Sequence, residues 1–356
     1  MSHSNQHTYS FDSISKEFMV STLDAETKQR FVEMIEAERR GREDIIYFSE
    51  VLLGVPLNDY QLKWLKRTTT PRSKWTEVFG ELIEDIKGFL FGSNISSIGN
   101  QSGKTVGIAI KHIWFNKYKI GMDLEANLIN TAHYATLNIS PHSRQTKACY
   151  QHVKDILGGQ FIIDEDGKKR LNVLSPLMRD FIAGDNVNLG EIRFVNKSVM
   201  YSVPTGQDQA SSLAGAQFGY ISYDECSQSL HLKDELGAKI LSRLIKYGSC
   251  LDLIATPEVD SPSHQYYLHI VRMGLKKLQG WWALTDMGMD NNRFIPKEQR
   301  ERAKASLLAT DKKRYRQVVK GEFVTSGKRF FDANEIENLW KLKGKKDCQK
   351  GGKYLL

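Results

Sequence analysis

Residues 96–105 read SSIGNQSGKT, and this stretch decides the fold. A short strand is predicted over residues 95–98 and a helix over residues 105–118, so a glycine turn joins the end of a strand to the start of a helix. A phosphate-binding loop requires that context. Gly99 and Gly103 would let the backbone curl until N–H groups point at phosphate oxygens, and the helix N-terminus adds the positive end of its dipole.

The residues of the predicted loop are Gly99, Asn100, Gln101, Ser102, Gly103, Lys104 and Thr105. We expect Lys104 to reach the β- and γ-phosphates of ATP, and the Thr105 hydroxyl to hold Mg²⁺. The match to G-x-x-x-x-G-K-[ST] is incomplete, because Ile98 stands where the first glycine belongs. A glycine turn before an ordinary helix is the alternative interpretation.

A second segment, residues 219–223, is a predicted strand that ends in Asp224 and Glu225. The carboxyl ends of parallel strands form the edge at which ligands bind in open α/β folds. We expect Asp224 to bind Mg²⁺ through its water shell, and Glu225 to orient and deprotonate an attacking water. Alone, two acids after an apolar run are also typical of a solvated turn. Together with the loop they predict a site that hydrolyses a nucleoside triphosphate.

Two further segments carry weaker signals. Residues 250–255 form a predicted strand followed by Thr256, whose hydroxyl would contact the γ-phosphate or the attacking water. A plain strand before a proline turn explains the same residues. Upstream of the loop, the Gln61 amide can pair with the donor and the acceptor on the edge of adenine, with Tyr60 or Trp64 packing the base. An amphipathic helix explains those residues equally well.

The remaining elements organise the chain around these segments. Helices are predicted over residues 11–45, 144–157, 236–247 and 297–319, a strand over 126–131, and a hairpin over 191–203. Strands separated by helices favour a mostly parallel α/β sheet. We predict an N-terminal helical segment over residues 1–45, the α/β core over 46–290, a C-terminal helical lid region over 291–330, and a basic linker over 331–356.

Composition excludes several classes of protein. Among 356 residues, Lys and Arg exceed Asp and Glu by 50 − 42 = 8, which permits a polyanionic partner. No apolar run approaches the roughly 20 residues of a membrane-spanning helix, so no membrane partner is expected. The four cysteines and nine histidines show no zinc-ligand spacing.

In this order, the segments resemble the large subunit of viral terminases, the DNA-packaging motors of tailed bacteriophages, over about residues 45–330. The family's loop reads roughly [SG]-[RN]-Q-x-G-K-[ST], and residues 99–105 match it, including the missing first glycine. Residues 130–157, 212–215 and 321–324 also resemble family segments. The resemblance implies a P-loop NTPase fold of the RecA-like ASCE class. It also implies that Gln61 reads adenine and that Thr256 belongs to a coupling motif.

The sequence departs from the family pattern in two ways. Many members carry an arginine at the position of Asn100 or of Ala214, and neither is present here. Because an arginine finger contributes orders of magnitude to hydrolysis, another residue would have to supply that charge. The candidates are Arg144, Arg179, Arg193 and Arg243, and we single out Arg243 and Arg144. Full family members also carry an RNase H-like nuclease domain. Only its opening strand is suggested by residues 352–356, so we expect no DNA cleavage.

The resemblance implies an ATPase motor that drives double-stranded DNA into a procapsid in the host cytoplasm, transiently docked on that procapsid. Its implied partners are the portal protein, the small terminase subunit and further copies of itself in a pentameric ring. One alternative is a superfamily 2-like helicase or nucleic-acid remodelling ATPase, which needs a second RecA-like domain that we do not find after residue 290. The other is a nucleotide-binding scaffold with weak or no hydrolysis, which the missing arginines would explain.

Overall fold

A mixed eight-stranded sheet forms the centre of the protein, with the strand order β10-β1-β9-β8-β2-β7-β6-β5. The computed structural model describes residues 24–83, 90–121, 134–159, 161–163, 169–171, 174–205, 217–244, 250–257 and 264–324. The strands of the sheet are β1 (Gly92–Ser97), β2 (Ala135–Ser140), β5 (Ile182–Asn186), β6 (Glu191–Phe194), β7 (Val199–Pro204), β8 (Tyr220–Asp224), β9 (Cys250–Ala255) and β10 (Trp281–Leu284). Neighbouring strands from β10 to β7 are parallel, and β6 and β5 add an antiparallel edge.

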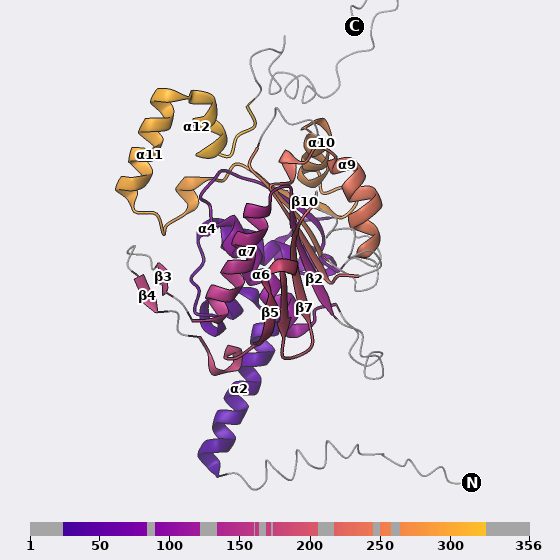
Figure 1. Ribbon diagram of the computed structural model, residues 1–356, viewed down its shortest axis with the longest axis vertical. Helices are drawn as coiled ribbons and strands as arrows, with labels where there is room; N and C mark the ends of the chain where they lie inside the picture. The colour runs from indigo at the N-terminus through magenta and orange to yellow at the C-terminus, as the bar shows by residue number, and fades with distance from the viewer. Residues whose placement is uncertain are drawn as a thin grey trace, which may run out of the picture.

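Helices cover both faces of this sheet (Figure 1). The longer ones are α2 (Ala25–Glu43), α4 (Asp59–Thr68), α6 (Lys104–Tyr118), α7 (Ser143–Leu157), α10 (His264–Leu275), α11 (Lys297–Thr310) and α12 (Lys312–Val318). Short helical pieces are α3 (Ile45–Tyr47), η1 (Phe48–Leu52), η2 (Arg72–Lys74), α5 (Trp75–Phe79), η3 (Pro176–Met178), η4 (Val187–Leu189), η5 (Cys226–Gln228), α9 (Leu232–Asp234), η6 (Glu235–Ile240), η7 (Leu241–Arg243) and η9 (Met289–Asn291). A separate hairpin pairs β3 (Phe161–Ile163) with β4 (Lys169–Leu171).

Two apolar cores explain why the central strands are stable where they lie. One core joins α4, α6 and α7 to one face of the sheet and includes Trp64, Phe115 and Val153. The other joins α9 and α10 to the opposite face and includes Leu232 and Tyr267. Every residue of β1, β2, β8 and β9 is buried, as expected of parallel strands covered on both sides.

These observations confirm the predicted mostly parallel α/β architecture, with several local corrections. The hairpin over residues 191–203 is confirmed as β6 and β7. The prediction of a single helix over residues 236–247 is wrong, because α9 is followed by the π-helical turn η6 and the 3₁₀ turn η7. The helical segment over 297–319 divides at Asp311, whose side chain caps α12. The strands β2, β5 and β10 were not predicted from local patterns, and the predicted strand over 126–131 lies outside the described residues.

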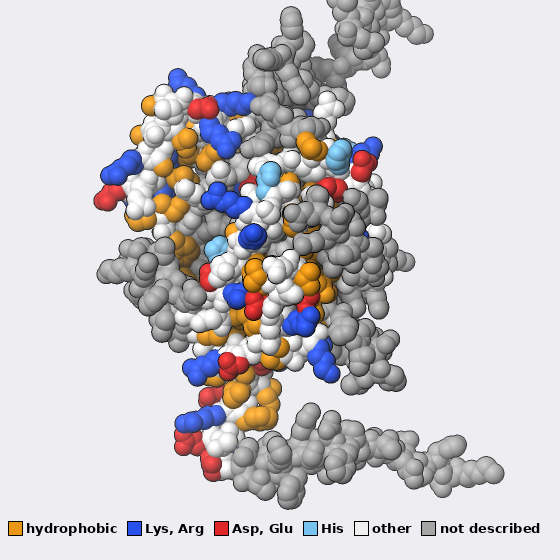
Figure 2. Space-filling model, in the orientation of Figure 1, with side chains coloured by type: hydrophobic (Ala, Val, Ile, Leu, Met, Phe, Trp, Pro, Cys, Tyr) orange, Lys and Arg blue, Asp and Glu red, His pale blue; other side chains and the backbone are white. Residues whose placement is uncertain are grey.

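The first and last described segments lie outside the central sheet. Helix α2 extends away from the body with exposed apolar side chains that include Phe31, Val32, Met34 and Ile35 (Figures 1 and 2). Residues 287–324, which we call the lid, carry α11 and α12 beside the sheet (Figure 1). Across the described segments, no helix combines the length and apolar character needed to span a bilayer. The predicted domain boundaries stay predictions, and the basic linker lies outside the described residues.

Candidate active site

The loop between β1 and α6 depends on two glycines that act in different ways. Gly103 has φ = +83° and directly precedes α6, and a Cβ there would lie 2.8 Å from the side-chain nitrogens of both Asn58 and Gln61. At Gly99, a Cβ would lie 2.0 Å from the carbonyl oxygen of Val318 in the lid. Gly103 therefore provides the left-handed turn, whereas Gly99 permits the close approach of the lid to the loop.

Three side-chain amides hold the loop from outside, one on each of the consecutive carbonyl oxygens of residues 101–103. Asn292 Nδ2 donates to the first at 2.6 Å, Asn58 Nδ2 to the second at 2.8 Å, and Gln61 Nε2 to the third at 2.9 Å. Because each peptide is planar and trans, the N–H groups that follow these carbonyls point to the opposite side. The loop thus presents successive N–H donors at a helix N-terminus, an arrangement that binds anions.

Sequence reasoning missed two of these three amides. Asn58 and Gln61 form a reciprocal capping box at the start of α4, with hydrogen bonds of 2.9 and 3.0 Å. The spacing of a capping residue and a glutamine three positions later was a usable signal. Asn292 reaches the loop from a distant part of the chain, and nothing in its neighbourhood in the sequence indicates this contact.

Lys104 and Glu225 come from different elements and meet at the same edge of the sheet. The Lys104 Nζ atom lies 3.0 Å from Glu225 Oε1 and donates to Thr256 Oγ1 at 2.9 Å. Both charged side chains are largely enclosed, with exposed fractions of 8% and 13%. Glu225 follows β8 with φ = 52°, a left-handed conformation that turns the chain at the strand end. In this state the lysine neutralises the carboxylate that was predicted to act as a base.

Thr256 connects this ion pair to the loop. Its hydroxyl donates to Asn100 Oδ1 at 2.6 Å, and its backbone N–H donates to Glu225 Oε2 at 3.3 Å. Asn100 is uncharged, so it joins the network through a hydrogen bond and adds no positive charge to it. The three strand ends that follow β1, β8 and β9 are therefore joined by one network.

Asp224 has surroundings that favour a bound cation. The residue is 1% exposed, and burial, followed by the negative charge of Glu225, raises the pKa of its carboxyl group from 3.8 to about 7. A side-chain hydrogen bond with Thr105 and the charge of Lys104 oppose that rise. A hydroxyl beside a buried carboxylate fits Mg²⁺, which takes few protein ligands and completes its shell with water and phosphate. Among the described residues, no three His, Cys, Asp or Glu side chains form a metal site of their own.

Gln61 and its aromatic neighbours lie deeper than the adenine hypothesis requires. Both ends of the Gln61 amide are bonded within the protein, to Asn58 N–H and to the Gly103 carbonyl, and the residue is 3% exposed. Adenine recognition by Gln61 stays a prediction, and it requires exchange of one of these bonds. The prediction that Tyr60 or Trp64 packs against a base is wrong. Both rings are fully buried and stack on each other, with their centroids 5.8 Å apart.

The arginine candidates do not converge on this network. Arg193 pairs with Glu191 on strand β6, and neither Arg144 nor Arg179 is hydrogen-bonded to Lys104 or to its partners. Arg243 lies in a short 3₁₀ turn before β9, and partial burial lowers its pKa. Ala214, the other departure from the family pattern, lies outside the described residues. The assignment of a catalytic arginine to Arg243 or Arg144 stays a prediction.

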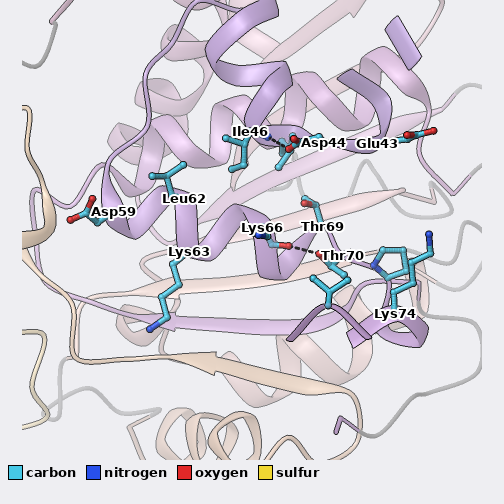
Figure 3. A pocket seen from close by; sticks show the side chains of 13 residues that line it. Glu43, Asp44, Ile46, Asp59, Leu62, Lys63, Lys66, Thr69, Thr70 and Lys74 are labelled. Atoms are coloured by element: carbon cyan, nitrogen blue, oxygen red, sulfur yellow. Dashed lines mark hydrogen bonds between the residues drawn. The ribbon is translucent and has the colours of Figure 1, made fainter. Parts of the chain in front are cut away.

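A cavity of about 780 Å³ lies elsewhere, on the outer face of α4 (Figure 3). Its wall combines the end of α2 with the exposed side of α4 and the following turn, and includes Asp44, Leu62, Lys63, Lys66 and Lys74. Lys63 and Lys74 point away from each other (Figure 3). None of the lining residues is hydrogen-bonded to the loop, so this cavity is separate from the candidate active site.

Comparison with known proteins supports the fold. No family model and no curated protein matches the chain. Among solved structures, the HK97 bacteriophage large terminase is similar, with 13% identity and a TM-score of 0.50 over 79% of this chain and 55% of that one. The Thermus phage P74-26 large terminase ATPase domain has 14% identity and a TM-score of 0.42 over 72% and 99%. A large terminase from another thermophilic bacteriophage, in complex with ADP, has 14% identity and a TM-score of 0.46 over 75% and 54%. At these identities the HK97 similarity shows a shared fold, and this chain spans about half of the HK97 protein.

Proposed function

We propose that this chain is the ATPase motor of a large terminase and that it couples ATP hydrolysis to translocation of double-stranded DNA into a procapsid. The observation that carries the proposal is the meeting of Lys104 with Glu225 and Thr256 beside the loop of residues 99–105. A lysine, a carboxylate and a hydroxyl at the carboxyl edge of a parallel sheet match the needs of phosphoryl transfer to water.

The side chains have distinct tasks in this mechanism. The N–H groups of the loop bind the β- and γ-phosphates, and Lys104 exchanges its contact with Glu225 for one with phosphate oxygens. Glu225, released from the ion pair, orients a water and accepts its proton as the oxygen attacks phosphorus and ADP leaves. Thr105 and Asp224 would hold Mg²⁺, which supplies positive charge against the phosphates. When the γ-phosphate is lost, the contacts of the Thr256 hydroxyl change, and this change is transmitted to the end of β9.

The proposal that the chain acts on DNA rests on its positive net charge and not on a defined groove. The chain has a net charge of +8. Lys and Arg side chains are scattered over the face shown in Figure 2, several of them over the lid. Such a distribution favours contacts to DNA phosphates that are independent of sequence and weaken with salt. The proposed partners are the portal protein, the small terminase subunit and further copies of this chain in a pentameric ring docked on a procapsid in the host cytoplasm.

The test combines phosphate release with two DNA assays. We expect phosphate release by the wild type to rise with double-stranded DNA, and the rise to shrink as salt is increased. Lys104→Ala should weaken ATP binding itself. The motor should displace a triplex-forming strand from duplex DNA without separating the duplex. Strand separation would instead support the helicase alternative, and absence of hydrolysis at ring-forming concentrations would support the scaffold alternative.

A further inference from the structure

Five buried polar residues form a continuous row across the middle of the sheet. The row consists of Asn94 on β1, Asp252 on β9, Ser222 on β8, Asn138 on β2 and Ser202 on β7. Each is in direct register with the next: Asn94 with Asp252, Asp252 with Ser222, Ser222 with Asn138, and Asn138 with Ser202. Their exposed fractions are 5% or less. We call these five residues the polar row.

Hydrogen bonds join most of the polar row directly. Asn94 Nδ2 donates to Asp252 Oδ1 at 2.8 Å, Ser222 Oγ donates to Asn138 Oδ1 at 2.8 Å, and Asn138 Nδ2 donates to Ser202 Oγ at 2.8 Å. The ends are also anchored. Arg72 donates to Asn94 at 2.6 Å, and Ser202 donates to a carbonyl oxygen of α7 at 2.8 Å.

Helix α6 bridges the one interval without a direct bond, between Asp252 and Ser222. Lys111 Nζ lies 2.7 Å from Asp252 Oδ2, and both side chains are at most 1% exposed. The neighbouring His112 shares a hydrogen bond of 2.8 Å with Ser222 Oγ. Tyr220 also donates to Asp252 Oδ2 at 2.9 Å. The helix that carries Lys104 is therefore tied to the centre of the sheet at two adjacent residues.

Stability alone does not account for such a row. Apolar side chains of similar size would fill this space without the cost of removing a lysine and an aspartate from water. Polar partners that must meet in one alignment instead discriminate against other strand registers. The carboxyl ends of these same strands carry the candidate active site. A fixed register between β8 and β9 at the polar row therefore fixes how far Asp224 and Thr256 lie along the strand direction relative to each other.

Helix α6 and strand β9 are linked twice, by two lysines of the helix. Lys104 contacts Thr256, and Lys111 contacts Asp252. The lysines lie about two helical turns, or ~10 Å, apart. Their partners are Asp252 on β9 and Thr256 directly after its last residue, ~13 Å apart along the strand direction. In the proposed mechanism the first link is exchanged for a phosphate contact. The second link is buried, away from the phosphates, and stays.

We propose that Lys111 and Asp252 are positioning residues, which hold Thr256 in line with Lys104 while Lys104 changes partners, and that Ser222 does the same for the end of β8. This inference rests on the proposed function, because it assigns the polar row to the hydrolytic site. Disruption of the polar row should impair turnover more than nucleotide binding.

The test uses a double variant that carries both Lys111→Met and Asp252→Leu, and a milder single variant, Ser222→Ala. Both are compared with Leu251→Ala as the matched control. Leu251 is equally buried but faces the opposite core of the sheet. The double variant removes both charges together, so neither Lys111 nor Asp252 leaves its partner as an uncompensated charge. Melting temperature, the Kd of a non-hydrolysable ATP analogue and kcat are measured for each. Amide exchange at Thr256, whose N–H donates to Glu225, is followed as well.

We expect kcat of the double variant to fall about tenfold or more while the Kd changes less than about threefold, with faster exchange at Thr256. Ser222→Ala should shift in the same direction. Leu251→Ala should lose thermal stability and keep kcat and the protection of Thr256. Equal losses in the control, or unchanged kcat and exchange in the double variant, would overturn the inference. If the wild type hydrolyses no ATP, the proposed function fails, and exchange at Thr256 still decides the positioning role.

Discussion

Gln61 provides a sharp test of how the loop binds nucleotide. The change Gln61→Glu keeps the size of the side chain and the oxygen that accepts from Asn58 N–H at 3.0 Å. It replaces the nitrogen that donates to the Gly103 carbonyl at 2.9 Å with a second oxygen. The capping box of α4 therefore survives, whereas one of the three bonds that hold the loop is lost.

The expected cost follows from that geometry. The Gly103 carbonyl oxygen keeps its helical hydrogen bond from Gly107 N–H at 3.1 Å. Loss of the second bond therefore costs about 0.5–1.5 kcal/mol, which corresponds to roughly 2- to 13-fold in affinity. The cost should appear in nucleotide binding, because the N–H donors of the loop lose their orientation. ATP and GTP should lose affinity by the same factor, since the loop contacts phosphates and not the base.

The assay is calorimetric titration of ATP and GTP analogues onto the wild type, Gln61→Glu and Asn188→Asp. The last variant adds a similar charge on an exposed turn beside the edge strand β5. It should bind both nucleotides as the wild type does. A selective loss of ATP binding in Gln61→Glu would refute the support role and favour adenine reading by this side chain.

Three further outcomes are expected. Gly99→Ala should destabilise the fold by about 1–3 kcal/mol in urea unfolding, because its Cβ would lie 2.0 Å from the carbonyl oxygen of Val318; an unchanged midpoint would contradict this contact. Thr256→Val removes the bonds to Lys104 and Asn100 and should lower kcat about tenfold with little change in Kd, and a kcat equal to that of the wild type would exclude the role of the hydroxyl. The pKa of Asp224 is about 7 in the folded state, above its ordinary value of 3.8, so the folded state binds more protons between these two pH values. The free energy of unfolding should therefore fall as pH rises through this window, by up to ~1.4 kcal/mol per pH unit. In Asp224→Asn the urea midpoint should depend less on pH between pH 5 and pH 7, and an equally steep dependence would contradict the assignment.

Local patterns predicted the parts of the site that lie at the ends of apolar strands. The strand before Asp224 and the strand before Thr256 both carry runs of buried residues, so their carboxyl ends were found. The helix of Lys104 was found from its apolar content and the preceding glycine turn. Where burial and apolar sequence agree, the pattern is sufficient.

Two polar strands show where that pattern fails. Strand β2, which was missed, contains Thr136, Asn138 and Ser140, and β1, found only in its last residues, contains Ser93 and Asn94, although all of these residues are buried. Polar side chains that satisfy one another inside the core remove the apolar signature of a buried strand. The polar row therefore concealed strands that it aligns.

Contacts between distant segments were also beyond local patterns. Asn292 reaches the loop from the lid, and Asn100 meets Thr256 across two strand ends. No periodicity or spacing relates such residues, because the sheet order brings them together. The sequence shows that Asn100 is not an arginine, but it does not show that Asn100 accepts a hydrogen bond from Thr256.

The most direct test of the central claim is phosphate release by Glu225→Gln measured beside its ATP affinity. The account predicts that this variant binds ATP about as tightly as the wild type, or more tightly, because Lys104 is freed from its ion pair. Phosphate release should fall by at least about 100-fold, since the proton acceptor for the attacking water is gone. Turnover at the wild-type rate would contradict the assignment of this carboxylate, and with it the hydrolytic site.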